Sequence, residues 1–189
     1  MKYLSIAACF ALIPAEAAMA TPAITYDCDT AASHFSELVL PAPAGSFTVT
    51  GQLQVNQLPP FDKFAPITRL MVVPGNIVPG GSVADTAGFS LNALPAKMVD
   101  KSVTDDKLML QFVNWNATHN NKAEDFKPFG FAKAGDKLPF TLTYDGAAVT
   151  LSVAGEKTSL PLKVADPMVR IVCSTGEFLY TDLRIEKAS

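Results

Sequence analysis

Apolar and polar residues alternate one by one through long parts of this chain. In residues 46–55, 140–144 and 149–153 nearly every second residue is apolar, and the residues between them are mostly Thr, Ser and Gln. Successive side chains of a β-strand point to opposite faces, so a period of two predicts strands with one buried and one solvated face. Asp145-Gly146 separates the last two segments and favours a tight turn. We therefore expect a β-hairpin over residues 140–153.

Three more strands are predicted in the C-terminal third of the chain. They cover residues 157–162, 168–173 and 178–185, with a turn at residues 174–176 between the last two. Residues 107–115 are apolar on both faces, which is typical of a strand in the centre of a packed sheet. Prolines occur throughout the chain, and no segment has the apolar stripe of an amphipathic helix.

Strands at roughly ten-residue spacing, joined by turn residues, favour antiparallel sheets, because parallel sheets need longer crossover connections. The fold class that we expect is all-β, a sandwich of two packed antiparallel sheets. No repeat or linker divides the chain. One domain is therefore predicted.

Two segments near the C-terminus resemble a known superfamily. AGDKLPFTLTYDG (residues 134–146) followed by VTLSVAG (residues 149–155) looks like the late strands of concanavalin A-like lectins and laminin-G-like jelly rolls, and GEFLYTDLRI (residues 176–185) is similar to their closing strand. The resemblance implies a concanavalin A-like jelly roll. Members of that superfamily bind glycans, cleave them, or serve as structural and protein-binding modules, so the fold constrains function only weakly.

The first twenty residues have the organisation of a secretory signal peptide. Lys2 precedes an apolar run at residues 4–13, and Ala18-Met19-Ala20 forms a small-x-small cleavage site. The run is shorter than the roughly twenty residues that a membrane-spanning helix needs, and no second run follows. We expect residues 1–20 to be removed and residues 21–189 to form one exported bacterial domain, periplasmic or extracellular, with no transmembrane segment.

Removal of the leader also removes Cys9 and leaves Cys28 and Cys173. In an oxidising compartment two cysteines predict one disulfide. A pair of buried, unpaired thiols is the alternative, since cysteine packs well as a small apolar residue. The Cα atoms of bonded cysteines lie within about 7 Å of each other. A bridge therefore requires the first and last strands to be neighbours.

Charge excludes two classes of partner. The net charge is −3, only 17% of the residues are charged, and the basic residues are scattered singly along the sequence. A phosphate-binding surface needs clustered cations, so no nucleic-acid partner is expected. A polybasic membrane-binding segment is missing for the same reason.

The residues give little support to an enzyme. The Glu-x-Asp-x-Glu pattern that places the carboxyls of retaining glucanases on one face of a strand does not occur. Lyases of similar fold use His and Tyr with Arg or Gln, and the only histidines here are His34 and His119. Serine-hydrolase, metal-binding and nucleotide-binding motifs are also missing. We therefore expect no catalytic residues, no protein-bound metal and no organic cofactor.

The candidate ligand site lies at the end of the predicted central strand. It combines the only tryptophan with amides and an imidazole, in the residues Asn114, Trp115, Asn116, His119 and Asn120. Sugar recognition uses an apolar ring for C–H groups and planar amides for hydroxyls. The alternative interpretation is a core tryptophan followed by turn-capping asparagines. Asn120, Asn121 and Asp125 also offer oxygens to calcium, without the fixed spacing of a known calcium loop.

Three functions follow from these observations. The first is an exported, non-catalytic binding module for glycans or cell-envelope polysaccharide. The second is a structural or protein-interaction protein of the envelope without a small ligand. The third is a polysaccharide lyase or hydrolase.

Overall fold

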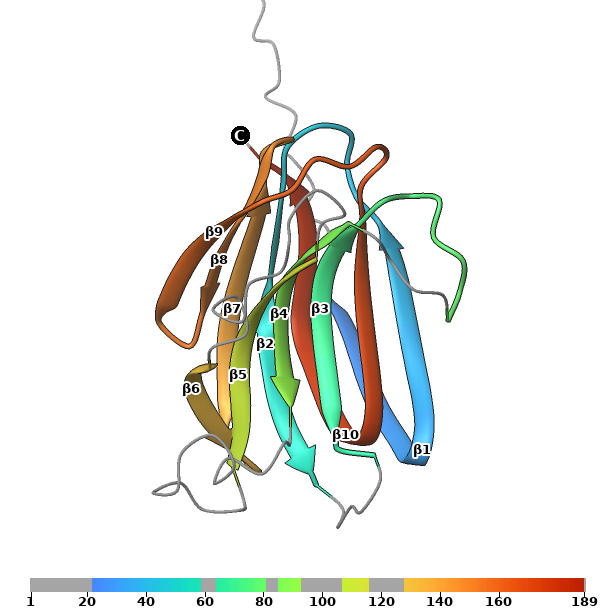
Figure 1. Cartoon of the computed structure of the whole chain (residues 1–189), viewed down its shortest axis with the longest axis vertical. Coiled ribbons are helices and arrows are strands. Elements are labelled where there is room, and N and C mark those ends of the chain that lie inside the picture. Colours follow the sequence, from blue (N-terminus) through green and yellow to red (C-terminus); the bar gives the residue numbers. More distant parts are fainter. Residues whose placement is uncertain (1–21, 59–63, 81–84, 93–106, 116–127, 189) are drawn as a thin grey trace, which may run out of the picture.

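The computed structural model of the chain describes residues 22–58, 64–80, 85–92, 107–115 and 128–188 (Figure 1). These residues contain ten strands and no helix, so the predicted all-β fold class is confirmed. No helix among them is long and apolar enough to cross a membrane. The strands are β1 (Ile24–Pro41), β2 (Phe47–Gln57), β3 (Ile67–Val73), β4 (Thr86–Asn92), β5 (Lys107–Trp115), β6 (Pro128–Lys133), β7 (Lys137–Tyr144), β8 (Ala148–Val153), β9 (Glu156–Pro161) and β10 (Met168–Lys187).

All ten strands belong to one antiparallel sheet in the order β6-β5-β4-β3-β10-β2-β7-β8-β9, with β1 paired to β10. The sheet curls back on itself, because β4 contacts β8 and β9 across the interior. Figure 1 shows β3, β4 and β5 in front of β2, β7 and β8. The long strand β10 joins the two halves: its first part pairs with β3 and its second part pairs with β2.

β10 changes partners at a bend, where the sequence predicted a turn between two separate strands. Thr175 has a φ of 53° and Gly176 a φ of 156°, backbone conformations that glycine tolerates better than other residues. β1 follows the bend by inserting extra residues, and its register shifts between Thr30 and Phe35. Hydrogen bonds hold β1 and β10 together at the bend, including one from Ser174 Oγ to the carbonyl of His34 at 2.7 Å. The prediction of a chain-reversing turn at residues 174–176 is therefore wrong.

The core lies between the two halves of the curled sheet. The rings of Phe89 on β4 and Phe140 on β7 meet with their centroids 5.4 Å apart, and Phe140 also contacts Tyr180 on β10 edge-on. The predicted alternation is confirmed, because the apolar members of β2, β7 and β8 are buried and their neighbours are not. These core residues are Phe47, Val49, Leu53, Val55, Leu138, Phe140, Leu142, Tyr144, Val149, Leu151 and Val153.

The predicted hairpin is present as β7 and β8. The Asp145 carboxylate accepts the backbone N–H groups of Ala147 at 2.8 Å and Ala148 at 2.7 Å, while Gly146 takes the positive φ of 95° that the turn requires. These two hydrogen bonds, that of Ala147 first, lower the pKa of Asp145 from its ordinary value. The turn sequence therefore sets the register in which Leu142 faces Leu151.

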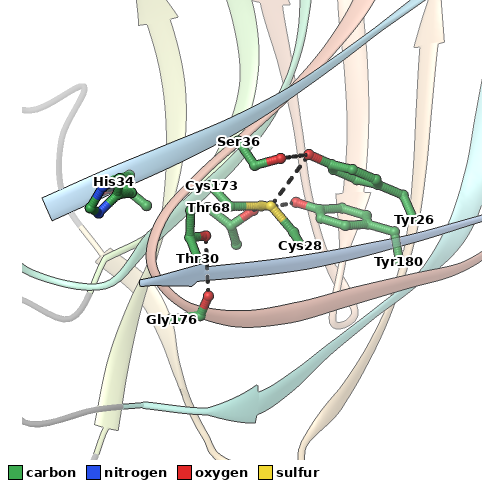
Figure 2. Close-up of a disulfide and its surroundings, with 10 residues drawn as sticks. Tyr26, Cys28, Thr30, His34, Ser36, Thr68, Cys173, Gly176 and Tyr180 are labelled. Atoms are coloured by element: carbon green, nitrogen blue, oxygen red, sulfur yellow. Dashed lines mark hydrogen bonds between the residues drawn. A yellow bond between two sulfur atoms is a disulfide. The ribbon is translucent and has the colours of Figure 1, made fainter. Parts of the chain in front are cut away.

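The Cys28–Cys173 disulfide is confirmed (Figure 2). It links β1 to β10 with a Cα–Cα distance of 6.2 Å, and both residues are fully buried. Tyr180 lies beside it, donating or accepting a 2.7 Å hydrogen bond with Thr68, whose hydroxyl is also 3.2 Å from Cys173 Sγ. Burial raises the pKa of Tyr180 far above its ordinary value. First and last strands are neighbours, as the predicted bridge requires.

One predicted position needs correction. β5 is not central: it lies second from the sheet edge, between β4 and the edge strand β6. Its apolar residues nevertheless occupy both faces, because Leu108 and Leu110 belong to the core while Met109 is buried on the opposite side. Apolar residues on both faces thus reflect the burial of Met109 on the outer side of this strand rather than a central place in the sheet.

Candidate functional site

The predicted cluster around Trp115 is only partly covered by the structure. Asn114 and Trp115 are the last residues of β5, and their backbones pair with Ala87 and Thr86 on β4. Their side chains lie outside the described residues. Asn116, His119 and Asn120 also lie outside them, as do Asn121 and Asp125 of the calcium hypothesis. The cluster and the calcium site therefore stay predictions.

A different set of polar residues is brought together on β3, β4 and β5. On these strands Leu70, Phe89 and Leu110 point into the core. The residues next to them in sequence, Arg69, Ser90 and Gln111, must point away from it, because side chains alternate along a strand. We call this side of β3, β4 and β5, with the adjoining parts of β6, β10 and β1, the outer face.

A polar row crosses the outer face. Arg69 is opposite Ser90 in the register, and Ser90 is opposite Gln111. The Asn92 amide nitrogen donates hydrogen bonds to Gln111 Oε1 at 2.7 Å and to Ser90 Oγ at 3.1 Å. Ser90 is only 1% exposed, so its hydroxyl is fixed within the sheet surface. We define Arg69, Ser90, Asn92 and Gln111 as the polar row.

Other residues of the outer face restrict what a ligand can reach. Met71 and Met109 are 5% and 1% exposed, although neither belongs to the core cluster between the two halves of the sheet. In contrast, Arg69 is exposed, and Asn92, Gln111 and Val113 are partly exposed. A guanidinium, two planar amides and a small apolar side chain are therefore the groups that this face offers. Amides and guanidinium groups suit the paired donors and acceptors of sugar hydroxyls.

An ion pair borders the polar row on the β10 side. Arg170 Nε donates to Glu37 Oε1 at 2.7 Å, and the two side chains are only 8% and 10% exposed. The second carboxylate oxygen, Glu37 Oε2, accepts the backbone N–H of Gly80 at 2.8 Å. Figure 1 shows the chain after β3 extending toward β1. One carboxylate thus holds both the Arg170 guanidinium and this segment.

Arg69 differs from Arg170, because no carboxylate of the described residues pairs with it. Within the described part of the chain, the structure contains no ion pair of Arg69. Partial loss of water around its guanidinium and, second, the positive charge of Arg170 lower the pKa of Arg69, although the residue as a whole is exposed. The group stays charged, since arginine does not lose its proton in proteins.

The opposite half of the sheet presents a simpler polar surface. Thr48 and Thr50 of β2 lie opposite Thr143 and Thr141 of β7, and the hydroxyls of Thr48 and Thr143 are 3.1 Å apart. None of the buried polar residues lies on β2, β7 or β8 among the described residues. Threonines on a solvated sheet face reflect β-propensity and need no ligand to explain them.

The groups used by lyases of similar fold are not assembled on the described part of the outer face. Arg69 and Gln111 are there, but Tyr144 and Tyr180 point into the core and Tyr26 lies beside the disulfide. His34 is exposed at the bend of β1. In the residues that the structure describes, no group of three metal-binding side chains is found either.

No protein-family model matches the sequence, and no curated protein sequence matches it. Solved structures do match. An alginate lyase from Alteromonas sp. 272 has a TM-score of 0.54 at 8% identity, covering 75% of this chain and 71% of that one. The polysaccharide lyase family 18 protein aly-SJ02 r-CATD has a TM-score of 0.54 at 8% identity, with 86% and 93% covered.

A third similar structure is a lectin domain. The potassium-bound carbohydrate recognition domain of Emp46p has a TM-score of 0.50 at 10% identity, covering 88% of this chain and 89% of that one. At such low identities the likeness concerns the fold alone. It agrees with the superfamily that residues 134–155 and 176–185 resemble. The chain therefore has the concanavalin A-like jelly-roll fold.

Proposed function

We propose that this protein is an exported, non-catalytic glycan-binding domain that holds polysaccharide on the outer face of β3, β4 and β5. The observation that carries the proposal is the polar row. Its amides are fixed by hydrogen bonds between Asn92, Ser90 and Gln111, so they are ordered before a ligand arrives. A site that is already ordered loses less conformational entropy on binding.

The similar structures support a role with glycans, because they are an alginate lyase, a polysaccharide lyase and a carbohydrate recognition domain. Binding without cleavage is favoured because the described tyrosines lie in the core or beside the disulfide, and His34 lies at the bend of β1. A lyase is the second candidate, since arginine and glutamine are among the groups that such enzymes use. A structural role without ligand would leave the ordered polar row unexplained.

We also propose that the two halves of the curled sheet are the two layers of a sandwich. Residues 21–189 form the mature domain after cleavage of the leader. The disulfide supports export, because such bonds persist mainly in oxidising compartments. Trp115, from the site that the sequence predicts, remains our candidate for an aromatic ring that packs against a sugar.

Replacement of Gln111 by alanine tests the proposal. A glycan array probed with residues 21–189 identifies a bound polysaccharide, and titration then gives its affinity. Gln111→Ala should lower this affinity about tenfold, the effect of losing one or two hydrogen bonds. Gln52→Ala is the matched control, because Gln52 is partly exposed on β2 in the other half of the sheet. It should leave the affinity unchanged.

Each outcome separates the candidate functions. Equal losses for Gln111→Ala and Gln52→Ala would place the ligand elsewhere and contradict the proposal. Release of unsaturated or reducing ends from the bound polysaccharide would identify a lyase or hydrolase. A domain that binds no glycan on the array would favour the structural role.

A further inference from the structure

Four cations that are far apart in the sequence share the outer face. Arg69 and Arg170 lie on β3 and β10, and Lys107 and Lys133 lie on β5 and β6. Leu108 and Ala132 are core residues, so their neighbours Lys107 and Lys133 point to the outer side. Among the described strand residues of this face, Glu37 is the only acidic one, and Arg170 already pairs with it.

Two of these cations lie opposite each other on neighbouring strands, so their like charges repel. Lys107 and Lys133 are direct partners in the register of β5 and β6. Like charges directly opposite each other destabilise a sheet. No ion pair of either ammonium group is found in the described part of the chain, and the nearby Asp136 carboxylate accepts the backbone N–H of Lys133 at 2.9 Å. Departures from local rules of this kind are expected at functional or strained sites.

The whole chain carries a net charge of −3, so the positive outer face is a local feature and not a result of general basicity. Strand spacing places Arg69 roughly 16 Å from Lys107 and roughly 20 Å from Lys133, with Asn92 and Met109 between them. A ligand that contacts both ends must be extended. It must also carry negative charge at more than one point along its length.

We infer that the ligand of the outer face is an anionic polysaccharide, whose repeated acidic groups contact Arg69 at one end of the face and Lys107 and Lys133 at the other. This inference rests on the proposed glycan-binding function and adds the class of ligand. Arg69 supplies a planar pair of donors that matches a carboxylate or sulfate. Arg170 is neutralised by Glu37 and serves to position the β10 side of the face.

The test compares acidic polymers with neutral polymers of the same backbone. The mature domain is titrated with alginate and its propylene glycol ester, with polygalacturonate and its methyl ester, and with dextran sulfate and dextran. At least one acidic polymer should bind ten times more tightly than its neutral counterpart, and the affinity should fall with added salt. The acidic polymer that binds identifies carboxylate or sulfate as the recognised group.

Variants then identify which cations of the outer face contribute to binding of the acidic polymer. Arg69→Gln should weaken binding of the acidic polymer about tenfold, as for loss of one charge-assisted hydrogen bond pair. Lys107→Gln should also weaken it, and a urea titration checks that both variants are folded. Lys157→Gln is the matched control, since it removes one exposed cation from β9 in the other half of the sheet. It should change the affinity less than twofold, within screened long-range effects.

Two results would overturn the inference. The first is equal affinity for an acidic polymer and its ester, and the second is equal loss for Lys157→Gln and Arg69→Gln. If a neutral glycan binds and Gln111→Ala removes that binding, the glycan-binding proposal stands while the anionic ligand is wrong. If no polymer of either kind binds, both fail.

Discussion

Leu142→Asp or Leu151→Asp should leave the domain unfolded at room temperature. Both leucines are fully buried and face each other across β7 and β8, where no cation lies beside them in the core cluster. An unpaired carboxylate in such surroundings costs several kcal/mol, against a total stability of about 5–15 kcal/mol for a domain. Circular dichroism and urea unfolding of the purified variants measure the result.

Thr141→Asp is the matched control for these two substitutions. Thr141 precedes Leu142 on the same strand and is exposed, so its carboxylate would stay in water. The variant should fold and lose less than about 1 kcal/mol. Unfolding of Thr141→Asp to the same extent would show that both sides of β7 are covered and that the assigned faces are wrong.

Removal of the disulfide should produce the second large loss of stability. The bond joins residues 145 positions apart, so it restricts nearly the whole unfolded chain. The loop-entropy treatment gives about 5 kcal/mol for a loop of this length, and measured losses for native bridges are typically 2–5 kcal/mol. We expect the double variant Cys28→Ala/Cys173→Ala to lose several kcal/mol in urea unfolding at equilibrium.

Reduction of the wild-type domain provides the control. Both cysteines are fully buried, so dithiothreitol should cut the bond only when the domain opens, and denaturant should accelerate the reaction. The denatured mature chain should contain no free thiol before reduction. Two titratable thiols per chain, or a double variant as stable as the wild type, would contradict this account of the bridge.

The part of the fold that sequence predicts is the part that local chemistry controls. β2, β7 and β8 follow from strict alternation, and the hairpin turn follows from Asp145 and Gly146, whose roles are local. The disulfide was predictable because leader removal would leave only two cysteines. The strands and the turn depend on residues close in sequence, and the disulfide depends on the number of cysteines.

Long-range pairing is what sequence alone does not reveal. β10 runs through residues 174–176 as one bent strand because β1 pairs with it on both sides of the bend, and β1 itself shows no simple alternation around its inserted residues. Gly88 gives a second example. A Cβ at this position would come within 2.7 Å of Met71 Cα and closer still to the carbonyl oxygen of Leu70, so β4 needs glycine there for a reason that only its neighbour β3 supplies.

The sequence alone does not reveal the outer face, because long-range strand pairing brings its residues together. Arg69, Lys107, Lys133 and Arg170 are isolated along the chain, which is why the sequence predicts no charged surface. The order of β6, β5, β4, β3 and β10 brings them to one side. Ser90 and Asn92 carried a usable signal, since they alternate with Phe89 and Leu91 on a short segment, but nothing local connects them to Gln111.

Amide chemical shifts recorded during titration with a polysaccharide fragment would locate the ligand on the sheet. We expect the largest changes at backbone amides of β3, β4 and β5 around Arg69, Ser90 and Gln111, with little change on β2 and β7. Changes concentrated at Thr48, Thr50, Thr141 and Thr143 would contradict this expectation, because they would place the ligand on the opposite half of the sheet.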